Sequence, residues 1–289
     1  MSLDASVALL VLLAAFLHAS WNAITKAGRD PLLTLWVVTG TGGVLASVAI
    51  FFVDFPARAA WPYLAGSIVL HLVYQLFLVT AYRLGDLSQV YPIARGLSPC
   101  VVAALAAIFI GELPVGLQLV GLLMVSLGIA SLAGGARGRG AAASGSGAGR
   151  ARWALAASVV TGLLIGAYTF VDGQGVRLSE QPFDFIAWGF FLDALPITLV
   201  AVCLRRRDLG RFFREEGARA AGGGVMATLA YAIVLWALSQ GGMAQISALR
   251  ETSVIVAAVI GTRVLREPFG ARRVLAAAVV AIGVVLLQS

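Results

Sequence analysis

The sequence predicts an all-α membrane protein, with ten transmembrane helices that form two inverted five-helix repeats around a central cavity. Composition is the first indication, because 60% of the 289 residues are hydrophobic and only 12% are charged. Soluble domains carry about 25% charged residues, and a soluble fold of this length would leave much of its apolar surface in water. The apolar runs are about 20 residues long and do not alternate with polar residues, which favours helices over a β-barrel.

The apolar segments divide into two groups of five, and this grouping is the second indication. The first five candidate spans cover residues 5–25, 32–53, 61–82, 88–110 and 115–133. The second five cover residues 153–173, 183–204, 219–239, 244–264 and 271–287. The tract between them is rich in Gly, Ala, Ser and Arg, a composition typical of flexible linkers. The predicted organisation is a first repeat over residues 1–133, a linker over 134–152 and a second repeat over 153–289.

Charged and small residues recur between the two halves, which is the third indication. A shift of 155 residues places Arg95 on Arg250, Ser98 on Ser253, Glu112 on Glu267 and Gly128 on Gly283. A shift of 147 places Trp21 and Asn22 on Tyr168 and Thr169, and Gly28 on Gly175. Apolar sequence matches by chance, but Arg and Glu that recur at one offset indicate a duplication. Because each copy has an odd number of spans, the second copy is expected to be inverted in the membrane.

The basic residues predict an orientation. Of the 21 Lys and Arg residues, 17 lie in the loops that follow spans 1, 3, 5, 7 and 9 or at the ends of the spans beside those loops. The positive-inside rule places these loops in the cytoplasm and both termini outside. The same rule accounts for the net charge of +7, so no nucleic-acid partner is expected. The sequence offers no metal-ligand cluster, and we expect neither a metal nor another cofactor.

Polar residues form stripes at helical spacing on six of the spans, and such residues usually face a bundle interior or a water-filled cavity. These spans are expected to surround the cavity, and their stripes supply the candidate substrate-binding residues. The candidates are His18, Trp21, Asn22, His71, Tyr74, Gln75, Tyr91, Arg95, Ser98, Tyr168, Asp172, Tyr231, Trp236, Arg250, Glu251 and Ser253. Spans 5 and 10 carry Gly and Ala instead, which suits close packing of helices at the periphery.

Several of these residues admit two interpretations. Arg95 and Arg250 could bind a carboxylate or another anionic group, for which the guanidinium fork is well matched. Alternatively, they form an internal ion pair with Glu251, Asp172 or Asp193, or extend towards the headgroups. The histidines are either hydrogen-bonded core residues or proton carriers, and the aromatic side chains either stack on substrate or pack.

Two further features concern the ends and the shape of the spans. Pro92, Gly96 and Pro99 are expected to kink the fourth span. Glu112 and Glu267 begin the turns to the next spans, and we expect them to cap a helix or to pair with a nearby Arg.

Three segments resemble the EamA-type branch of the drug/metabolite transporter superfamily: HASWNAITKAG, YPIARGLSP with its GELP turn, and SALRETS with its REP turn. The resemblance covers nearly the whole chain outside the linker. It implies a ten-helix basket around a central cavity, alternating access, and export of amino acids, aromatic ones included, or related amphipathic compounds. Members usually have cytoplasmic termini, unlike the orientation predicted here. The related four-helix multidrug transporters carry a membrane-embedded Glu in their first helix, whereas this first span has only Asp4 at its start.

The expected function is therefore a secondary transporter of the bacterial inner membrane, a monomer or homodimer whose partners are a small-molecule substrate and lipid. Asp172, Asp193 or Glu251 could couple transport to protons in place of a first-helix carboxylate, or the carrier could work without coupling. One alternative is an efflux carrier for drugs or cations. A membrane enzyme acting on lipid-linked substrates is disfavoured, because no HExxH, GxSxG or Walker pattern is present. A scaffold or receptor without flux is the remaining class.

Overall fold

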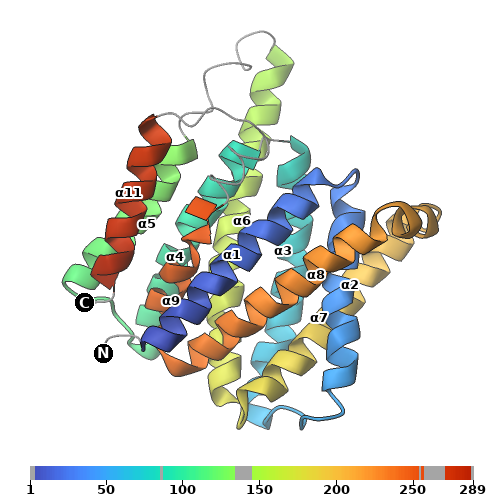
Figure 1. Cartoon of the computed structure of the whole chain (residues 1–289), viewed down its shortest axis with the longest axis horizontal. Helices are drawn as coiled ribbons and strands as arrows, with labels where there is room; N and C mark the ends of the chain where they lie inside the picture. The colour runs from blue at the N-terminus through green and yellow to red at the C-terminus, as the bar shows by residue number, and fades with distance from the viewer. Residues whose placement is uncertain (1–3, 85–86, 134–144, 254, 257–270, 288–289) are drawn as a thin grey trace.

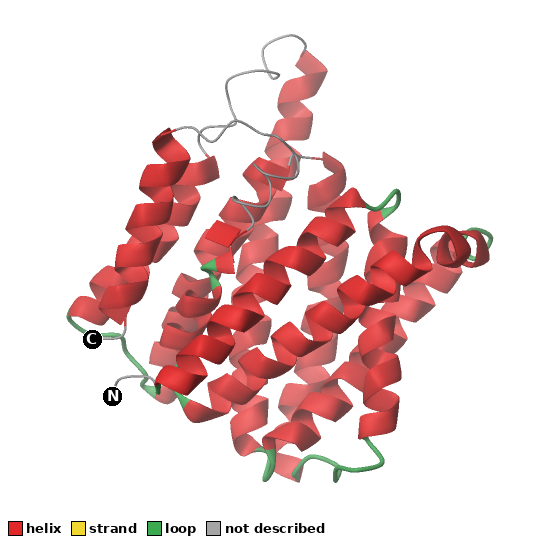
Figure 2. Ribbon diagram, in the orientation of Figure 1, coloured by secondary structure: helices red, strands yellow, loops and turns green. Residues whose placement is uncertain are grey.

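The computed structural model describes residues 4–84, 87–133, 145–253, 255–256 and 271–287. Within these ranges all regular structure is helical (Figures 1 and 2). The helices of the first half are α1 (Ala5–Ala27), α2 (Pro31–Ala49), the short 3₁₀ helix η1 (Arg58–Ala60), α3 (Trp61–Leu84), α4 (Leu87–Ile110) and α5 (Leu117–Ala133). Those of the second half are α6 (Gly145–Leu178), α7 (Pro182–Arg205), α8 (Leu209–Gln240), α9 (Met243–Arg250) and α11 (Ala271–Leu287).

Helix starts follow local chemistry that the sequence contains. The Asp30 carboxylate accepts hydrogen bonds from the backbone N–H groups of Leu32 and Leu33, and Pro31 occupies the first helical position of α2. Both features favour a helix N-terminus. Asp4 caps α1 in the same way, accepting from the Ser6 N–H at 2.7 Å.

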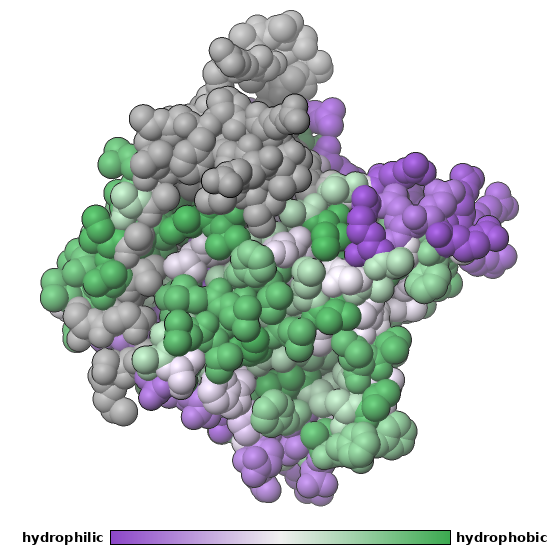
Figure 3. Space-filling view, viewed as in Figure 1, coloured by the Kyte–Doolittle hydropathy of each residue, from purple (hydrophilic) through white to green (hydrophobic). Residues whose placement is uncertain are grey.

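Seven helices in the described part of the chain are long and apolar enough to cross a membrane. Large apolar side chains such as Phe51 and Phe52 lie 82% exposed on the outer surface, as a lipid-facing surface requires. Figure 3 shows hydrophobic atoms over the middle of the molecule and hydrophilic atoms gathered at its extremities. The chain is therefore a multi-pass integral membrane protein.

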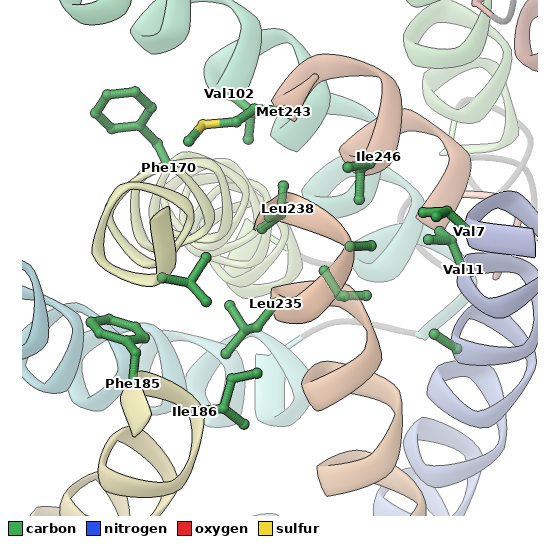
Figure 4. Close-up of a cluster of buried hydrophobic side chains, with 14 of the residues drawn as sticks. Val7, Val11, Val102, Phe170, Phe185, Ile186, Leu235, Leu238, Met243 and Ile246 are labelled. Carbon is green, nitrogen blue, oxygen red and sulfur yellow. The ribbon is translucent and has the colours of Figure 1, made fainter. Parts of the chain in front are cut away.

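The helices of the two halves interleave. The most extensive contacts between the halves join α1 to α8, α3 and α4 to α6, α2 to both α7 and α8, and α5 to α11. Buried apolar side chains of α1, α4, α6, α7, α8 and α9 meet in one large cluster (Figure 4). The paired helices α5 and α11 lie at one edge (Figure 1). Small residues allow their close approach, as expected, since a Cβ on Gly283 would lie 2.8 Å from the Gly121 carbonyl oxygen.

The predicted ninth span is wrong in one respect, because α9 ends at Arg250 instead of running on without interruption. The N–H groups of Glu251 and Thr252 bond to carbonyls only three residues earlier, at 3.0 and 3.2 Å. The Thr252 hydroxyl also donates to the Leu249 carbonyl at 2.8 Å, so a side chain competes for the helical acceptor. Predicted span residues 257–264, and Glu267, lie outside the described residues.

Two other helices bear on their predicted form. α4 is one continuous helix through Pro92, Gly96 and Pro99, and a kink within it stays a prediction. Neighbouring helices in a membrane bundle tolerate proline and glycine within a span. α6 begins at Gly145, so the end of the predicted linker is helical and extends away from the bundle (Figure 1).

Candidate functional site

A cavity of about 90 Å³ lies midway along the helices. Residues from both halves of the chain line it. They are His18, Trp21, Leu35, Val38, Thr39, Gly42, His71, Tyr74 and Gln75 from the first half, and Tyr168, Phe190, Asp193, Ala227, Thr228 and Tyr231 from the second. A smaller cavity of about 40 Å³ shares His71, Asp193, Phe190 and Tyr231 with it and extends to Ser67 and Asp172.

Aromatic rings surround His71 in the middle of α3. Its imidazole lies 4.2 Å from the Tyr168 ring and 5.7 Å from the Tyr231 ring, between centroids. Tyr168 in turn lies 5.1 Å from Tyr74. These rings give the cavity walls that combine apolar faces with hydroxyl groups, which suits an amphipathic or cationic ligand.

Two carboxylates flank His71 from different helices. His71 Nε2 lies 3.7 Å from Asp172 Oδ2 on α6, and His71 Nδ1 lies 4.0 Å from Asp193 Oδ1 on α7. The Tyr231 hydroxyl donates to Asp172 Oδ2 at 2.5 Å, and the Gln75 amide donates to Asp193 Oδ2 at 3.4 Å. Asp172 is 1% exposed and its Oδ1 has no hydrogen-bond partner. The cluster is thus a buried acidic site with capacity for a further donor.

A second charged cluster contains the two arginines that recur in the repeat. Arg95 Nε lies 2.6 Å from Glu251 Oε2, and Arg250 Nε lies 3.7 Å from Glu251 Oε1. Arg95 also donates to the Ser253 hydroxyl at 3.4 Å. The internal ion pair with Glu251 is therefore the arrangement present. Arg95 and Arg250 together carry two positive charges, whereas Glu251 supplies one negative charge, so the cluster has one positive charge in excess. The Arg250 guanidinium lies 6.0 Å from the centre of the Tyr231 ring.

The predicted substrate-binding residues fall into two groups. The larger cavity brings together His18, Trp21, His71, Tyr74, Gln75, Tyr168 and Tyr231, and the smaller one adds Asp172. The remainder do not line either cavity. Arg95, Ser98, Arg250, Glu251 and Ser253 are buried around the ion pair, and Trp236 packs against the apolar cluster. Asn22 accepts from the Tyr82 hydroxyl at 3.2 Å, and the Tyr91 side chain lies outside the described residues.

His18 has its hydrogen-bonding needs met locally. The Trp21 indole N–H donates to His18 Nδ1 at 3.2 Å, which makes that nitrogen an acceptor and leaves the imidazole neutral. His71 has no comparable donor, because the Ser67 hydroxyl, 3.2 Å from its Nδ1, can serve as donor or acceptor.

The helices around the cavity are not all those expected. α2 and α7 contribute Thr39, Gly42, Phe190 and Asp193 to the larger cavity, whereas none of the described side chains of α4 or α9 lines it. Arg95 of α4 instead contacts Glu251 and Ser253, which follow the end of α9. Asp193 is the charged lining residue that the predicted set of substrate-binding residues omitted, although it was considered for ion pairing and proton coupling. Its signal was a carboxylate in the middle of an apolar span.

Ion pairs connect the helices at each end of the bundle. At the end where α6 finishes, Arg177 contacts Glu112 Oε1 at 2.5 Å and donates to the Leu238 and Gly241 carbonyls. Glu112 Oε2 also accepts from the Met243 N–H at 3.2 Å, so the expected pairing of Glu112 with an Arg is confirmed. These contacts tie α4, α6, α8 and α9 together.

At the opposite end, Asp30 lies 3.4 Å from Arg83 and 3.2 Å from Arg205. Partial burial would raise the pKa of Asp30, but the N–H groups of Leu32 and Leu33 and the two guanidinium groups together lower that pKa below its ordinary value. The carboxylate is therefore ionised at neutral pH and links α2 to α3 and α7.

Comparison with known proteins agrees with this architecture. The model of the EamA-like transporter family matches residues 5–134 and 152–289. A crystal structure described only as that of a protein has the same fold, with a TM-score of 0.71 at 16% identity over 97% of this chain and 96% of the other. No curated protein sequence matches. Because the family model covers both halves and almost the entire chain, this protein belongs to the EamA-like transporter family.

Proposed function

We propose that this chain is a secondary transporter that exports amino acids, aromatic ones included, or related amphipathic compounds by alternating access. The observation that carries the proposal is the mid-depth cavity, to which both halves of the chain contribute charged and aromatic side chains. A cavity between two structural halves, near the middle of the membrane, is the usual location of a transporter binding site.

The contacts support two inverted repeats of five helices. If α6 to α9 correspond to α1 to α4, the contact of α1 with α8 has its counterpart in the contact of α6 with α3. Corresponding helices also meet each other, as α2 meets α7 and α5 meets α11. The corresponding residues Arg95 and Arg250 share Glu251. A pseudo-two-fold axis through the centre of the bundle would generate all of these relations.

Alternating access requires that contacts at the two faces break in turn. The Arg177–Glu112 contact lies at one face and the Asp30–Arg205 contact at the other. The interruption of α9 after Arg250 supplies a place where backbone can move without breaking a full helical turn. We propose that these ion pairs close the two faces and that the break in α9 accommodates the change.

Charges of both signs near the cavity favour a zwitterionic substrate. Asp193 lines the larger cavity, and Arg250 lies beyond the Tyr231 ring that forms part of its wall. An efflux carrier for cations is the second candidate, because the aromatic walls and the two carboxylates would also suit a cation without a carboxylate group.

Counterflow in proteoliposomes tests the proposal. Liposomes preloaded with an unlabelled amino acid should accumulate the same labelled amino acid, for a panel that includes phenylalanine, tryptophan, leucine and threonine. Tetraphenylphosphonium in the same assay tests the cation alternative. No flux of any member by folded protein would contradict the carrier function.

A pair of glycines on α2 provides matched variants. A Cβ on Gly42 would lie 2.8 Å from Thr228 Oγ1, inside the cavity wall, whereas a Cβ on Gly40 would meet nothing within 4 Å. Gly42→Val should therefore reduce counterflow strongly, and Gly40→Val should leave it unchanged. Equal flux in the two variants would indicate that substrate does not pass through this cavity.

A further inference from the structure

We propose that Asp172 and Asp193 bind the ammonium group of the substrate, and that a proton on His71 takes its place when the site is empty. The inference deepens the proposed transport function and rests on it, because the ammonium group reaches this buried site only through the cavity. It adds a substrate class, compounds with a cationic amine, and a means of coupling their movement to protons.

The geometry leaves one oxygen of each carboxylate able to accept a hydrogen bond from a cation beside His71. Each carboxylate uses its Oδ2 to accept a hydrogen bond, from Tyr231 and Gln75 respectively. Neither Oδ1 has a hydrogen-bond partner within bonding geometry, although the Ser67 hydroxyl lies close to Asp172. Both carboxylates line the smaller cavity of about 40 Å³, so a donor in that space can reach them. His71 stands between them but lies 3.7 and 4.0 Å away, beyond hydrogen-bond distance.

The balance of buried charge points to the same conclusion. Among the described residues in the middle of the helices, Arg95 and Arg250 are positive, and Glu251, Asp172 and Asp193 are negative. With both histidines neutral, this interior carries one negative charge in excess. A buried charge without a partner is costly in a membrane protein. Either one proton or one substrate cation restores neutrality in this interior, whereas both together would leave it with one positive charge in excess.

The walls of the site favour an organic cation. The Tyr168 and Tyr231 rings lie 5.9 Å apart between centroids and meet at 83°, and both line the larger cavity with Trp21 and Phe190. Aromatic faces attract ammonium groups, and they also pack against the apolar part of an amine. A small inorganic cation would use the carboxylates but would leave these rings without a role.

His71 is the group that gains and loses the proton, and the charged side chains around it determine when it does so. The titratable and charged side chains that face it are Asp172 and Tyr168 from α6, Asp193 from α7, Tyr231 from α8, Tyr74 on its own helix, and, at longer range, His18, Arg95 and Arg250. The nearest charges are the two carboxylates, so protonated His71 is stabilised while the carboxylates are free. Arrival of an ammonium group cancels that attraction.

The exchange conserves atoms and charge. As the ammonium group enters between the carboxylates, the N–H bond of protonated His71 breaks and the proton passes to water in the open cavity. The imidazole keeps the electron pair and becomes neutral. When the cavity opens to the other side and the ammonium leaves, a proton from water on that side binds His71 again. One amine therefore moves one way for each proton that moves the other.

Binding to the purified full-length protein tests this directly. Three ligands share one aromatic ring and differ in charge: phenethylamine is a cation, 3-phenylpropionate an anion and L-phenylalanine a zwitterion. Ligand affinity is obtained from thermal stabilisation in detergent between about pH 5 and about pH 8, where histidine titrates and an amine stays protonated. Phenethylamine and phenylalanine should stabilise the protein, and 3-phenylpropionate should not. The Kd of phenethylamine should rise about tenfold for each unit by which the pH falls in the range where His71 is protonated, because each ammonium displaces one proton.

Variants separate this site from general effects on the fold. Asp193→Asn should weaken phenethylamine binding by about tenfold or more and should remove its pH dependence. His71→Gln should lose the pH dependence of the phenethylamine Kd, whatever the change in the Kd itself. Asp184→Asn is the matched control, since Asp184 is a buried carboxylate on the same helix that lines neither cavity. It should leave both quantities unchanged.

The outcomes distinguish the two proposals. If phenethylamine binds wild type and Asp193→Asn equally, or if His71→Gln keeps the wild-type pH profile, the ammonium site is overturned. If Asp193→Asn does not fold, the His71→Gln profile decides alone. Phenylalanine counterflow without affinity for phenethylamine would overturn the ammonium site and leave the carrier function standing. Absence of both binding and counterflow for all ligands would overturn both.

Discussion

Replacement of Glu251 by Gln should destabilise the protein strongly, because Glu251 is the carboxylate that the two buried arginines share. Its side chain is 0% exposed and that of Arg95 is 3% exposed, with 2.6 Å between Oε2 and Nε. Removing one partner of a buried ion pair leaves an uncompensated charge, which costs about 3–5 kcal/mol. For a protein of this size that corresponds to a fall in Tm of roughly 6–20 °C. The assay is thermal unfolding of the purified protein in detergent.

An exposed ion pair provides the matched control. Arg29 Nη1 lies 3.0 Å from Glu215 Oε2, but the two side chains are 79% and 47% exposed. Solvent screens such a pair, so Glu215→Gln should cost no more than about 1 kcal/mol. Similar Tm values for Glu251→Gln and Glu215→Gln would refute the argument that burial makes the Glu251 pair important.

A double variant tests the cause of the loss. Arg95→Met together with Glu251→Met removes one positive and one negative charge, so the charge around Arg250 stays as it is in wild type. Apolar replacement of a whole buried pair is often neutral or stabilising. The double variant should therefore be more stable than Glu251→Gln, giving a favourable coupling in the mutant cycle. Additive losses would show that packing, and not charge, determines the stability there.

Three further outcomes are expected. Gly166→Ala should lower stability by about 1–3 kcal/mol in the same unfolding assay, because the added Cβ would overlap the Val101 side chain. Gly222→Ala is its control and should be neutral or stabilising, because a Cβ there would meet nothing within 4 Å. Arg177→Gln should cost about 1.5–3 kcal/mol, since the guanidinium bonds two backbone carbonyls as well as Glu112; an unchanged Tm would contradict that role. Asp30→Asn should destabilise the protein at neutral pH, and the stability of this variant should approach that of wild type in acid. The pKa of Asp30 is lower in the folded protein than its ordinary value. The contribution of Asp30 to stability is therefore present above the ordinary aspartate pKa and is lost as the pH falls through the folded pKa. A difference between the two proteins that stays constant with pH would contradict the last prediction.

The local sequence was sufficient to predict many of the structural elements of this protein. The positions of α1, α2, α3 and α7 follow from apolar runs of membrane length, because lipid requires every span to satisfy its own backbone. Capping by Asp30 could be predicted from its place before Pro31. The recurrence of Arg95 at Arg250 indicated a duplication, and the family match covers both halves. These features depend on neighbouring residues or on comparison of one segment with another.

Which polar groups meet across the bundle was decided by the tertiary structure alone. The stripe on α3 identified His71 as inward-facing, yet nothing in the sequence paired it with Asp172 and Asp193 from two other helices. The same holds for Arg95 and Glu251, which are 2.6 Å apart although they lie in opposite halves. Helical periodicity gives the direction of a side chain relative to its own helix axis, but not the rotation or crossing of that helix against others.

The sequence by itself therefore determined that the chain lies in lipid, where most of its helices run and which residues are too polar to face acyl chains. The tertiary structure decided that α2 and α7 line the cavity, that α9 ends at Arg250, and that the charges separate into an acidic and a basic cluster. The physical reason is that hydrophobic burial in lipid acts on each helix separately. Helix pairing depends instead on close contacts of small residues and on buried charges that find partners only after the helices have assembled.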